Sequence, residues 1–492
     1  MIQKIIDNTQ VYIDSFPKTE RKKIGQFFTS IKTAQYMASF IKAKEYLKVA
    51  DIGAGTGILT AAVVEKLLRS RKVKQIDVTL YEDDKNVHEV LIKNMHIIDE
   101  HCRRKNIVLN VRLIKENFIL CNKNKWDSRD YGGEYDIVIS NPPYMKIGKN
   151  TDESKAMSDI VYGQPNMYFL FMSMGLKLLK KDGDYIFIVP RSWTSGLYFK
   201  DFRKYFLENL SISKMHLFVS RDKVFDKESV LQEIMIIFGK KSNKQKYRIS
   251  ITTSNDATDF KNVSKICVNS KICISQNDDK FILLPIIQND VEILKLFSQF
   301  KETLESQGFI FKTGQVVEFR NKEELCSYKE NGVIPLICPF HFDNGYIKFP
   351  VKSSKTQYIK RTAKPSLLME KKDMLLLKRF TSKEEVRRLQ PAILIGDSIE
   401  FSQIALENHV NYLEKREGKI SVDELYGIWA ILKSEKWDQY YRILNGSTQV
   451  NASEVNGMPM PRLEQIKMIG NKVRNDSVQN FESKIEEILY GW

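Results

Sequence analysis

The chain has 492 residues, 42% of them hydrophobic, which is enough to bury two substantial cores, so we expect two domains. No run approaches the roughly 18 consecutive apolar residues of a membrane-spanning helix, and the N-terminus lacks the apolar segment of a signal peptide, which excludes a membrane or secreted protein and favours the cytoplasm. The formal net charge of +16 favours a polyanionic partner, because basic surfaces gain affinity by releasing counterions condensed on phosphates.

The first predicted unit is a strand at residues 47–50, a glycine-rich turn at 51–57 and a helix at 58–68. This order is typical of the first unit of a doubly wound sheet, where glycines let a ligand approach the backbone. The glycines alternate, which differs from both the dinucleotide fingerprint and the phosphate loop. Alternating glycines after Asp51 suit a nucleoside that carries a cationic sulfonium and an amino acid, since the carboxylate attracts positive charge.

Two further strands are predicted at residues 76–81 and 107–114. The first ends at Glu82, in the position where a carboxylate binds ribose hydroxyls in such folds. A solvated acidic turn is the alternative interpretation. The second strand leads to Asn117 and Phe118, which we expect to meet the edge and the face of the nucleoside's adenine.

A fourth strand, at residues 135–140, ends at Asn141-Pro142-Pro143-Tyr144. A buried apolar strand closed by two prolines leaves these residues at a rigid strand end. The Asn141 amide oxygen and the Pro142 carbonyl are two acceptors beside the flat ring of Tyr144. This arrangement suits a planar heterocycle with an exocyclic amino group, of which adenine is the commonest. The alternative is a proline-rich turn after a core strand.

Together these motifs resemble those of amino-methylating DNA methyltransferases in which the cofactor motifs precede NPPY and the target recognition domain comes last. The closest resemblance is to the BsuBI/PstI-like adenine-N6 enzymes of type II restriction-modification systems. It extends to residues 23–29 and 166–190, and more weakly to 314–320 and 446–452. In one departure, Asn117 stands where the third motif usually carries Asp. Its oxygen still accepts, so the resemblance implies a changed contact strength and an intact site.

The resemblance implies S-adenosyl-L-methionine as cofactor, double-stranded DNA as partner, and a cognate restriction endonuclease acting on the same site in a prokaryotic cytoplasm. Asn141, Pro142 and Tyr144 would be catalytic, with Tyr144 stacking on a flipped-out adenine whose N6 is methylated. Phe225 would close the other face, with core packing as an equal alternative. The cofactor-binding set would be Phe28, Thr29, Asp51, Gly53, Gly55, Gly57, Glu82, Asn117 and Phe118, and no metal is needed.

The fold class expected is α/β, with a doubly wound, mostly parallel Rossmann-like methyltransferase sheet in residues 1–245. A mixed α+β recognition domain would follow in residues 246–492. The boundary is placed there because a polar, basic stretch at 239–246 follows the last regular strand, and because the later pattern is irregular. Residues 463–489 show helical spacing of apolar residues. Candidate DNA contacts in this half are Lys360-Arg361, Lys378-Arg379 and Arg387-Arg388, by phosphate contact more than base readout.

Three other functions fit parts of this pattern. NPPY also occurs in methyltransferases that modify RNA or protein glutamine, although their chains are usually shorter, and cytosine N4 fits the same two acceptors. A DNA-binding specificity protein without catalysis is disfavoured by the intact Asn141, Pro142 and Tyr144. A fused restriction nuclease is disfavoured because only about twenty residues precede the cofactor motifs. The six cysteines and six histidines show no metal-ligand spacing, so reduced thiols are expected.

Overall fold

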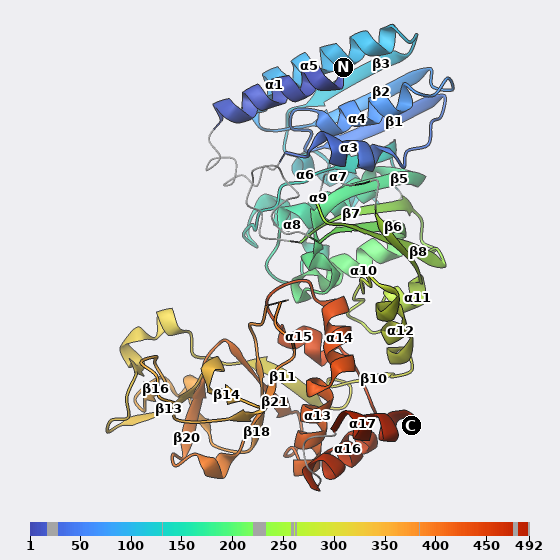
Figure 1. Cartoon of the computed structure of the whole chain (residues 1–492). Helices are drawn as coiled ribbons and strands as arrows, with labels where there is room; N and C mark the ends of the chain where they lie inside the picture. Colours follow the sequence, from blue (N-terminus) through green and yellow to red (C-terminus); the bar gives the residue numbers. More distant parts are fainter. Residues whose placement is uncertain are drawn as a thin grey trace. The chain divides into compact units, whose positions relative to one another are not determined.

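The computed structural model describes residues 1–16, 28–129, 131–219, 233–256, 260, 263–382, 384–475 and 481–490. The chain divides into two compact units, Met1–Gln288 and Asn289–Trp492, both drawn in Figure 1. Each unit has its own sheets and its own buried apolar residues.

The first unit is built on a nine-stranded sheet in the order β3-β2-β1-β4-β5-β7-β6-β8-β9 within the described residues. Its strands are β1 Tyr46–Ile52, β2 Gln75–Tyr81, β3 Val108–Ile114, β4 Tyr135–Ser140, β5 Leu179–Pro190, β6 Leu210–Phe218, β7 Ile234–Lys241, β8 Arg248–Ser254 and β9 Ser264–Asn269. The strands from β3 to β5 are parallel, whereas β7 is antiparallel to both of its neighbours. The mostly parallel, doubly wound sheet confirms the predicted fold class.

Helices cover both faces of this sheet. They are α1 Ile2–Ser15, α3 Ile31–Ala38, α4 Ile58–Leu67, α5 His88–Arg103, α6 Phe118–Cys121, α7 Lys123–Asp127, α8 Asp152–Ala156, α9 Met167–Leu178, α10 Lys200–Asn209 and α11 Ser270–Cys273. Helices α1, α3, α4 and α5 share one apolar core with the sheet. On the other face α9 packs closely: a Cβ at Gly175 would lie within 3.2 Å of side chains on β1, β4 and β5. Burial on both faces explains why β1 and β4 read as continuous apolar runs.

The strand order reverses between β1 and β4, which pair in parallel with Asp51 opposite Ile139. From β1 the chain runs outward to β2 and β3, then returns across the sheet to β4. Crevices form outside the carboxyl ends of the strands at such a reversal. This topology therefore brings the glycine-rich turn after β1 and the NPPY segment after β4 to one edge of the sheet.

The division between the units falls later than the boundary expected after residue 245. Strand β8 pairs in parallel with β6, from Lys214 opposite Ser250 to Phe218 opposite Ser254, and β9 pairs with β8. The polar stretch at 239–246 is therefore the end of β7 and a turn inside the first unit. The irregular pattern beyond it concealed two more strands of the same sheet.

The second unit contains a six-stranded sheet, β11-β21-β18-β19-β15-β14, and a five-stranded sheet, β12-β16-β13-β20-β17, in the part of the chain described. Its strands are β10 Glu302–Thr303, β11 Phe309–Thr313, β12 Leu325–Cys326, β13 Val333–Ile337, β14 Phe342–Asp343, β15 Tyr346–Ile347, β16 Tyr358–Lys360, β17 Met369–Glu370, β18 Met374–Lys378, β19 Pro391–Leu394, β20 Gln403–Leu406, β21 Val410–Lys415 and β22 Pro459–Met460. Its helices are α12 Gln288–Phe297, α13 Val422–Lys433, α14 Glu435–Leu444, α15 Ala452–Asn456, α16 Leu463–Asn475 and α17 Phe481–Tyr490. The mixed α+β composition and the helices after residue 463 agree with the sequence expectation.

Helices α13 and α16 approach each other through glycines. A Cβ at Gly427 of α13 would lie 2.0 Å from the Ile466 carbonyl oxygen, and one at Gly470 of α16 would lie 1.8 Å from the Asp423 carbonyl oxygen. Both contacts are to backbone, which has little room to move. The start of α13 is fixed by a capping box, in which Ser421 and Glu424 exchange side-chain and backbone hydrogen bonds.

Candidate active site

A cavity of about 490 Å³ lies where β1, β2 and β4 end. Several segments of the first unit line it: the N-terminal segment, the turns after β1, β2 and β3, the start of α4, the strand end after β4, and helices α8 and α9. The lining residues are Phe16, Phe28, Thr29, Gly53, Ala54, Gly55, Thr56, Ile58, Leu59, Glu82, Asp83, Asp84, Asn86, Asn117, Asn141, Pro143, Met145, Glu153, Met167 and Phe171. A volume of this size is typical of small-molecule and cofactor sites.

The glycine-rich turn forms one wall of the cavity. Gly53, Gly55 and Gly57 all have positive φ, at 75°, 53° and 82°, a region that glycine adopts without steric cost. Gly53 and Gly55 line the cavity, so their backbone faces the open space. Gly57 does not line it. A Cβ there would lie 2.5 Å from Met95 Cε, so this glycine serves the packing of α5 against the turn.

The carboxylate of Glu82 holds the turn from the end of β2. Its Oε2 accepts from the Gly55 N–H at 2.7 Å, and its Oε1 accepts from the Asp84 N–H at 3.0 Å. Burial raises the pKa of the Glu82 carboxyl to about 7, against the lowering effect of these two hydrogen bonds. Glu82 is 8% exposed and lines the cavity, so the solvated-turn alternative does not describe it.

Asp51 occupies a different position from the one expected. Its side chain is fully buried and does not line the cavity. Oδ2 accepts from the Thr60 N–H at 3.1 Å and from the Thr60 hydroxyl at 2.7 Å, while burial raises the pKa of the carboxyl to about 7. The expectation that Asp51 faces a cationic ligand is corrected, because the side chain turns toward α4 and fixes its first turn.

Of the two predicted residues after β3, one lines the cavity and the other does not. Asn117 lines the cavity, its Oδ1 accepting from the N–H groups of α6 and its Nδ2 donating to Glu153. Phe118 does not line the cavity, since it is buried with its ring centroid 4.9 Å from those of Tyr81 and Phe171. The aromatic side chain that does reach the cavity from this cluster is Phe171 of α9. Phe118 therefore packs behind Phe171, which lies between it and the cavity.

Sequence reasoning missed Glu153 and Phe171 as site residues. Phe171 lies in the helical segment that carried the family resemblance, but helical spacing alone did not show which of its aromatic residues faces the cavity. For Glu153 a local signal exists: Thr151 caps α8 and an acidic first turn follows NPPY closely. That signal is shared by many surface helices, so it is weak without the fold.

The NPPY segment places one predicted catalytic side chain in the cavity wall. Asn141 lines the cavity, and its Nδ2 donates to the Thr29 hydroxyl oxygen at 3.0 Å. Pro142 is buried behind the wall. The Tyr144 hydroxyl donates to the Ile188 carbonyl at 3.0 Å, and burial raises the pKa of Tyr144 well above its usual range.

The remaining predicted site residues are Phe28 and Thr29 in the N-terminal segment, and Phe225, the predicted second stacking residue. Phe28 and Thr29 line the cavity. Residues 23–27 lie outside the part of the chain that the structure describes, and so does Phe225. Helix α1 reaches the glycine turn, because the Thr9 hydroxyl donates to Thr56 Oγ1 at 2.9 Å.

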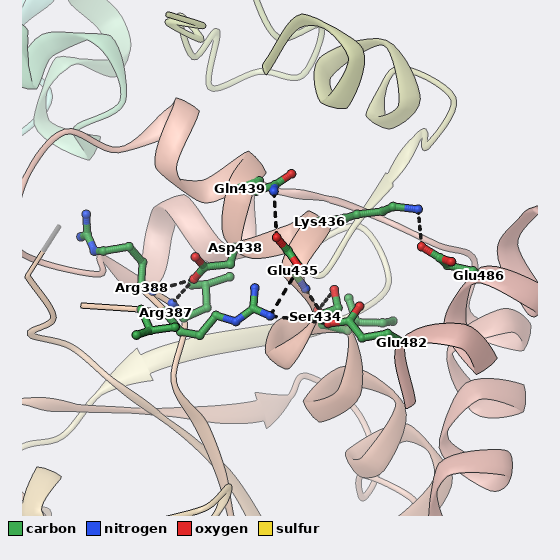
Figure 2. A network of polar contacts seen from close by, with 12 residues as sticks. Arg387, Arg388, Ser434, Glu435, Lys436, Asp438, Gln439, Glu482 and Glu486 are labelled. Carbon is green, nitrogen blue, oxygen red and sulfur yellow. Dashed lines mark hydrogen bonds and ion pairs between the residues drawn. The ribbon is translucent and has the colours of Figure 1, made fainter. Parts of the chain in front are cut away.

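Two of the basic residues proposed to contact DNA have structural partners instead. Figure 2 shows Arg387 and Arg388 in a polar network with α14 and α17. Arg388 is fully buried, and its guanidinium donates to Thr381 Oγ1 at 3.1 Å and to the Ser447 carbonyl at 2.7 Å. The prediction for Arg388 is therefore wrong, because a buried guanidinium cannot reach a phosphate.

Arg387 lies in the same network as a half-buried ion-pair partner. Its guanidinium is 3.9 Å from Glu435 and 3.8 Å from Glu482. Of the other candidates, Lys360 and Arg361 are exposed, and Lys360 Nζ donates to the Glu323 carbonyl at 2.7 Å. Arg379 donates to the Asn408 carbonyl at 2.9 Å. The exposed pair is the better candidate for contact with a polyanion.

The sheet topology, together with a glycine-rich turn and an NPPY strand end on one cavity, is that of a Rossmann-like methyltransferase. The chain matches the model of the Eco57I restriction-modification methylase family over residues 28–225. It is 30% identical to the type II methyltransferase M.PstI of Providencia stuartii, over 96% of this chain and 93% of that protein. It is also 30% identical to the type II methyltransferase M.BsuBI of Bacillus subtilis, over 99% of this chain and 98% of that protein.

The chain therefore belongs to the type II methyltransferases of restriction-modification systems, which confirms the resemblance noted in the sequence. Among solved structures, the DrdV–DNA complex has a TM-score of 0.49 and 12% identity, over 94% of this chain and 58% of that one. In the described residues, no helix has the length and apolar character needed to cross a membrane.

Proposed function

We propose that this protein transfers a methyl group from S-adenosyl-L-methionine to the N6 amino group of an adenine at a specific site in double-stranded DNA. The modification would protect that site from a cognate restriction endonuclease in a prokaryotic cytoplasm. The observation that carries this proposal is that Asn141 lines the same cavity as Gly53, Gly55 and Glu82. The acceptor for an amino group and the features of a nucleoside site thus lie on one cavity.

The lining of the cavity fits the cofactor. Gly53 and Gly55 bring the backbone within reach of a ligand, and the Glu82 carboxylate suits ribose hydroxyls. Phe171 offers an aromatic ring for adenine, and Asp83 lies on the same cavity, where negative charge favours a cationic ligand. When bound, the cofactor supplies a methyl group that its sulfonium makes reactive.

The chain's own contribution to the reaction is to hold the amino group of the target base. Nδ2 of Asn141 donates to the Thr29 hydroxyl, which leaves the amide oxygen of Asn141 as the proposed acceptor. The Pro142 carbonyl is the second acceptor, on a residue that has no N–H of its own. Two preorganised acceptors stabilise the positive charge that develops on the amino nitrogen, and they favour a pyramidal nitrogen.

The target base must leave the duplex to reach these acceptors. Unstacking and unpairing cost a few kcal/mol, and stacking on an aromatic ring returns about 1–3 kcal/mol per base. We assign this stacking to Tyr144, whose hydroxyl is anchored on the Ile188 carbonyl. The second unit, Asn289–Trp492, is proposed to read the DNA sequence.

The test is product analysis of methylated DNA. Full-length protein is incubated with DNA and labelled cofactor, and the nucleosides are identified by mass spectrometry. We expect N6-methyladenine, and we expect Asn141→Ala to lower turnover by at least about a hundredfold while cofactor binding persists. Detection of N4-methylcytosine instead would show that the target base is cytosine, whose amino group fits the same two acceptors. Near-normal turnover by the variant would refute the role of Asn141.

A further inference from the structure

The oxygen of Asn117 is already occupied by the backbone. It accepts from the Ile119 N–H at 3.1 Å and from the Leu120 N–H at 3.2 Å, at the start of α6. These two donors use both lone pairs of the amide oxygen. An aspartate here would keep a second oxygen for a ligand, whereas the second polar atom of Asn117 is a donor. At this edge of the cavity Asn117 alone therefore provides no further acceptor.

The donor of Asn117 points to a carboxylate on the same cavity. Nδ2 donates to Glu153 Oε1 at 2.9 Å, and both residues line the cavity. Within the described residues, no hydrogen bond or ion pair uses Glu153 Oε2. Helix α8 holds Glu153 in place, because Thr151 caps the helix and Ser154 and Ala156 are buried.

The surroundings of Glu153 are acidic. Asp83 lines the cavity as well, and the pKa of its carboxyl is raised, first by burial and then by the negative charges of Asp84 and Glu153. Glu153 is thus close enough to Asp83 for the two charges to repel. An edge of this kind favours a ligand group that donates hydrogen bonds over one that accepts them.

We propose that Glu153 recognises the exocyclic amino group of the cofactor's adenine, with Asn117 as its positioning partner. Glu153 Oε2 accepts from the amino group, while Asn117 holds Oε1 in place. The inference rests on the proposed use of S-adenosyl-L-methionine. It also predicts discrimination: a purine with a carbonyl in place of the amino group sets oxygen against carboxylate oxygen and is rejected.

The test compares two ligands by titration calorimetry on the full chain: S-adenosylhomocysteine and its 6-oxo counterpart, S-inosylhomocysteine. We expect the unmodified protein to prefer the adenosyl ligand, and Glu153→Gln to lower that preference by about tenfold to a hundredfold, the scale of one hydrogen bond to a charged group. The matched control is Asp152→Asn, which removes the same charge one residue earlier, at a side chain that does not line the cavity. It should keep the preference.

A double variant makes the test stricter. Asn117→Asp combined with Glu153→Gln exchanges the amide and the carboxylate, so the introduced aspartate can cap α6 with one oxygen and accept from adenine with the other. We expect the exchanged pair to restore the preference. An unchanged preference in Glu153→Gln, or no restoration in the exchanged pair, would overturn the assignment. If the unmodified protein binds no S-adenosylhomocysteine, the proposed function itself fails.

Discussion

Thr29 contacts the side chain of Asn141, the residue on which the proposed chemistry depends. Its hydroxyl accepts from Asn141 Nδ2 at 3.0 Å, and the side chain is only 7% exposed. With Nδ2 turned toward the Thr29 hydroxyl, the amide oxygen of Asn141 is directed away from Thr29. A contact outside NPPY therefore helps to hold the side chain that carries the proposed acceptor.

Removing this hydroxyl should slow turnover more than it weakens binding. We expect Thr29→Val, which is similar in volume, to lower kcat about fivefold to tenfold, the value of roughly one hydrogen bond, with a smaller change in cofactor affinity. Thr29→Ser keeps the hydroxyl and should retain most of the activity. Steady-state kinetics with calorimetry of S-adenosylhomocysteine separates the two effects. Equal kcat values for the valine and serine variants would show that the contact does not matter.

Glu82 predicts how stability depends on pH. Burial raises the pKa of its carboxyl to about 7 from its usual 4.5, so between these values the folded chain binds more protons than the unfolded chain. Stability without cofactor should therefore fall as pH rises through this window. We expect Tm to decrease between pH of about 5.5 and about 8, and Glu82→Gln to reduce that slope. Asp51, with its pKa raised to about 7, contributes in the same direction, so the reduction is partial.

The control for this measurement is Asp152→Asn, because Asp152 is exposed. For this variant, the slope of Tm against pH should equal that of the unmodified protein. A Glu82→Gln variant with an unchanged slope would show that Glu82 titrates in the folded chain as it does in the unfolded one.

At the scale of elements, the accuracy of sequence prediction depended on how local each signal was. The strand, turn and helix at residues 47–68 were predicted well, because apolar runs and glycine spacing are local patterns. The directions in which the Asp51 and Phe118 side chains point were not predicted, because they depend on contacts with α4 and α9. Strand β8 was missed because its partner is β6, more than thirty residues earlier, with β7 between them in the chain.

The α13–α16 pair predicts a local destabilisation. We expect Gly470→Ala to destabilise the second unit by about 1–3 kcal/mol, because the new methyl group would overlap the Asp423 carbonyl of α13 and force the helices apart. Met468→Ala, on the same helix at a side chain that is 55% exposed, is the control and should change little. Thermal unfolding followed by calorimetry measures both. Equal midpoints for the two variants would contradict the close approach.

At the scale of the whole molecule, the division between the units predicts which fragment folds. Residues 1–288 keep all strands described for the first sheet, whereas residues 1–245 lose β8 and β9 and expose the edge of β6. We expect the longer fragment to be soluble and to bind S-adenosylhomocysteine, and the shorter one to aggregate. The longer fragment should also lose site-specific DNA binding, if the second unit reads the sequence. A shorter fragment that is equally soluble and binds equally well would contradict the division.

Helix α1 lies at the start of the chain, yet it belongs to the wall of the cavity. Thr9 bonds to Thr56 in the glycine turn, Asn8 bonds to Asn94, which also donates to the Thr56 carbonyl, and Phe16 lines the cavity just beyond the helix. A ligand that orders the turn must therefore also stabilise the docking of α1, and a docked α1 must raise the affinity for that ligand by the same factor. A segment fused to the N-terminus that disturbs the docking of α1 should therefore lower the affinity for that ligand, so a purification tag is better placed at the other end.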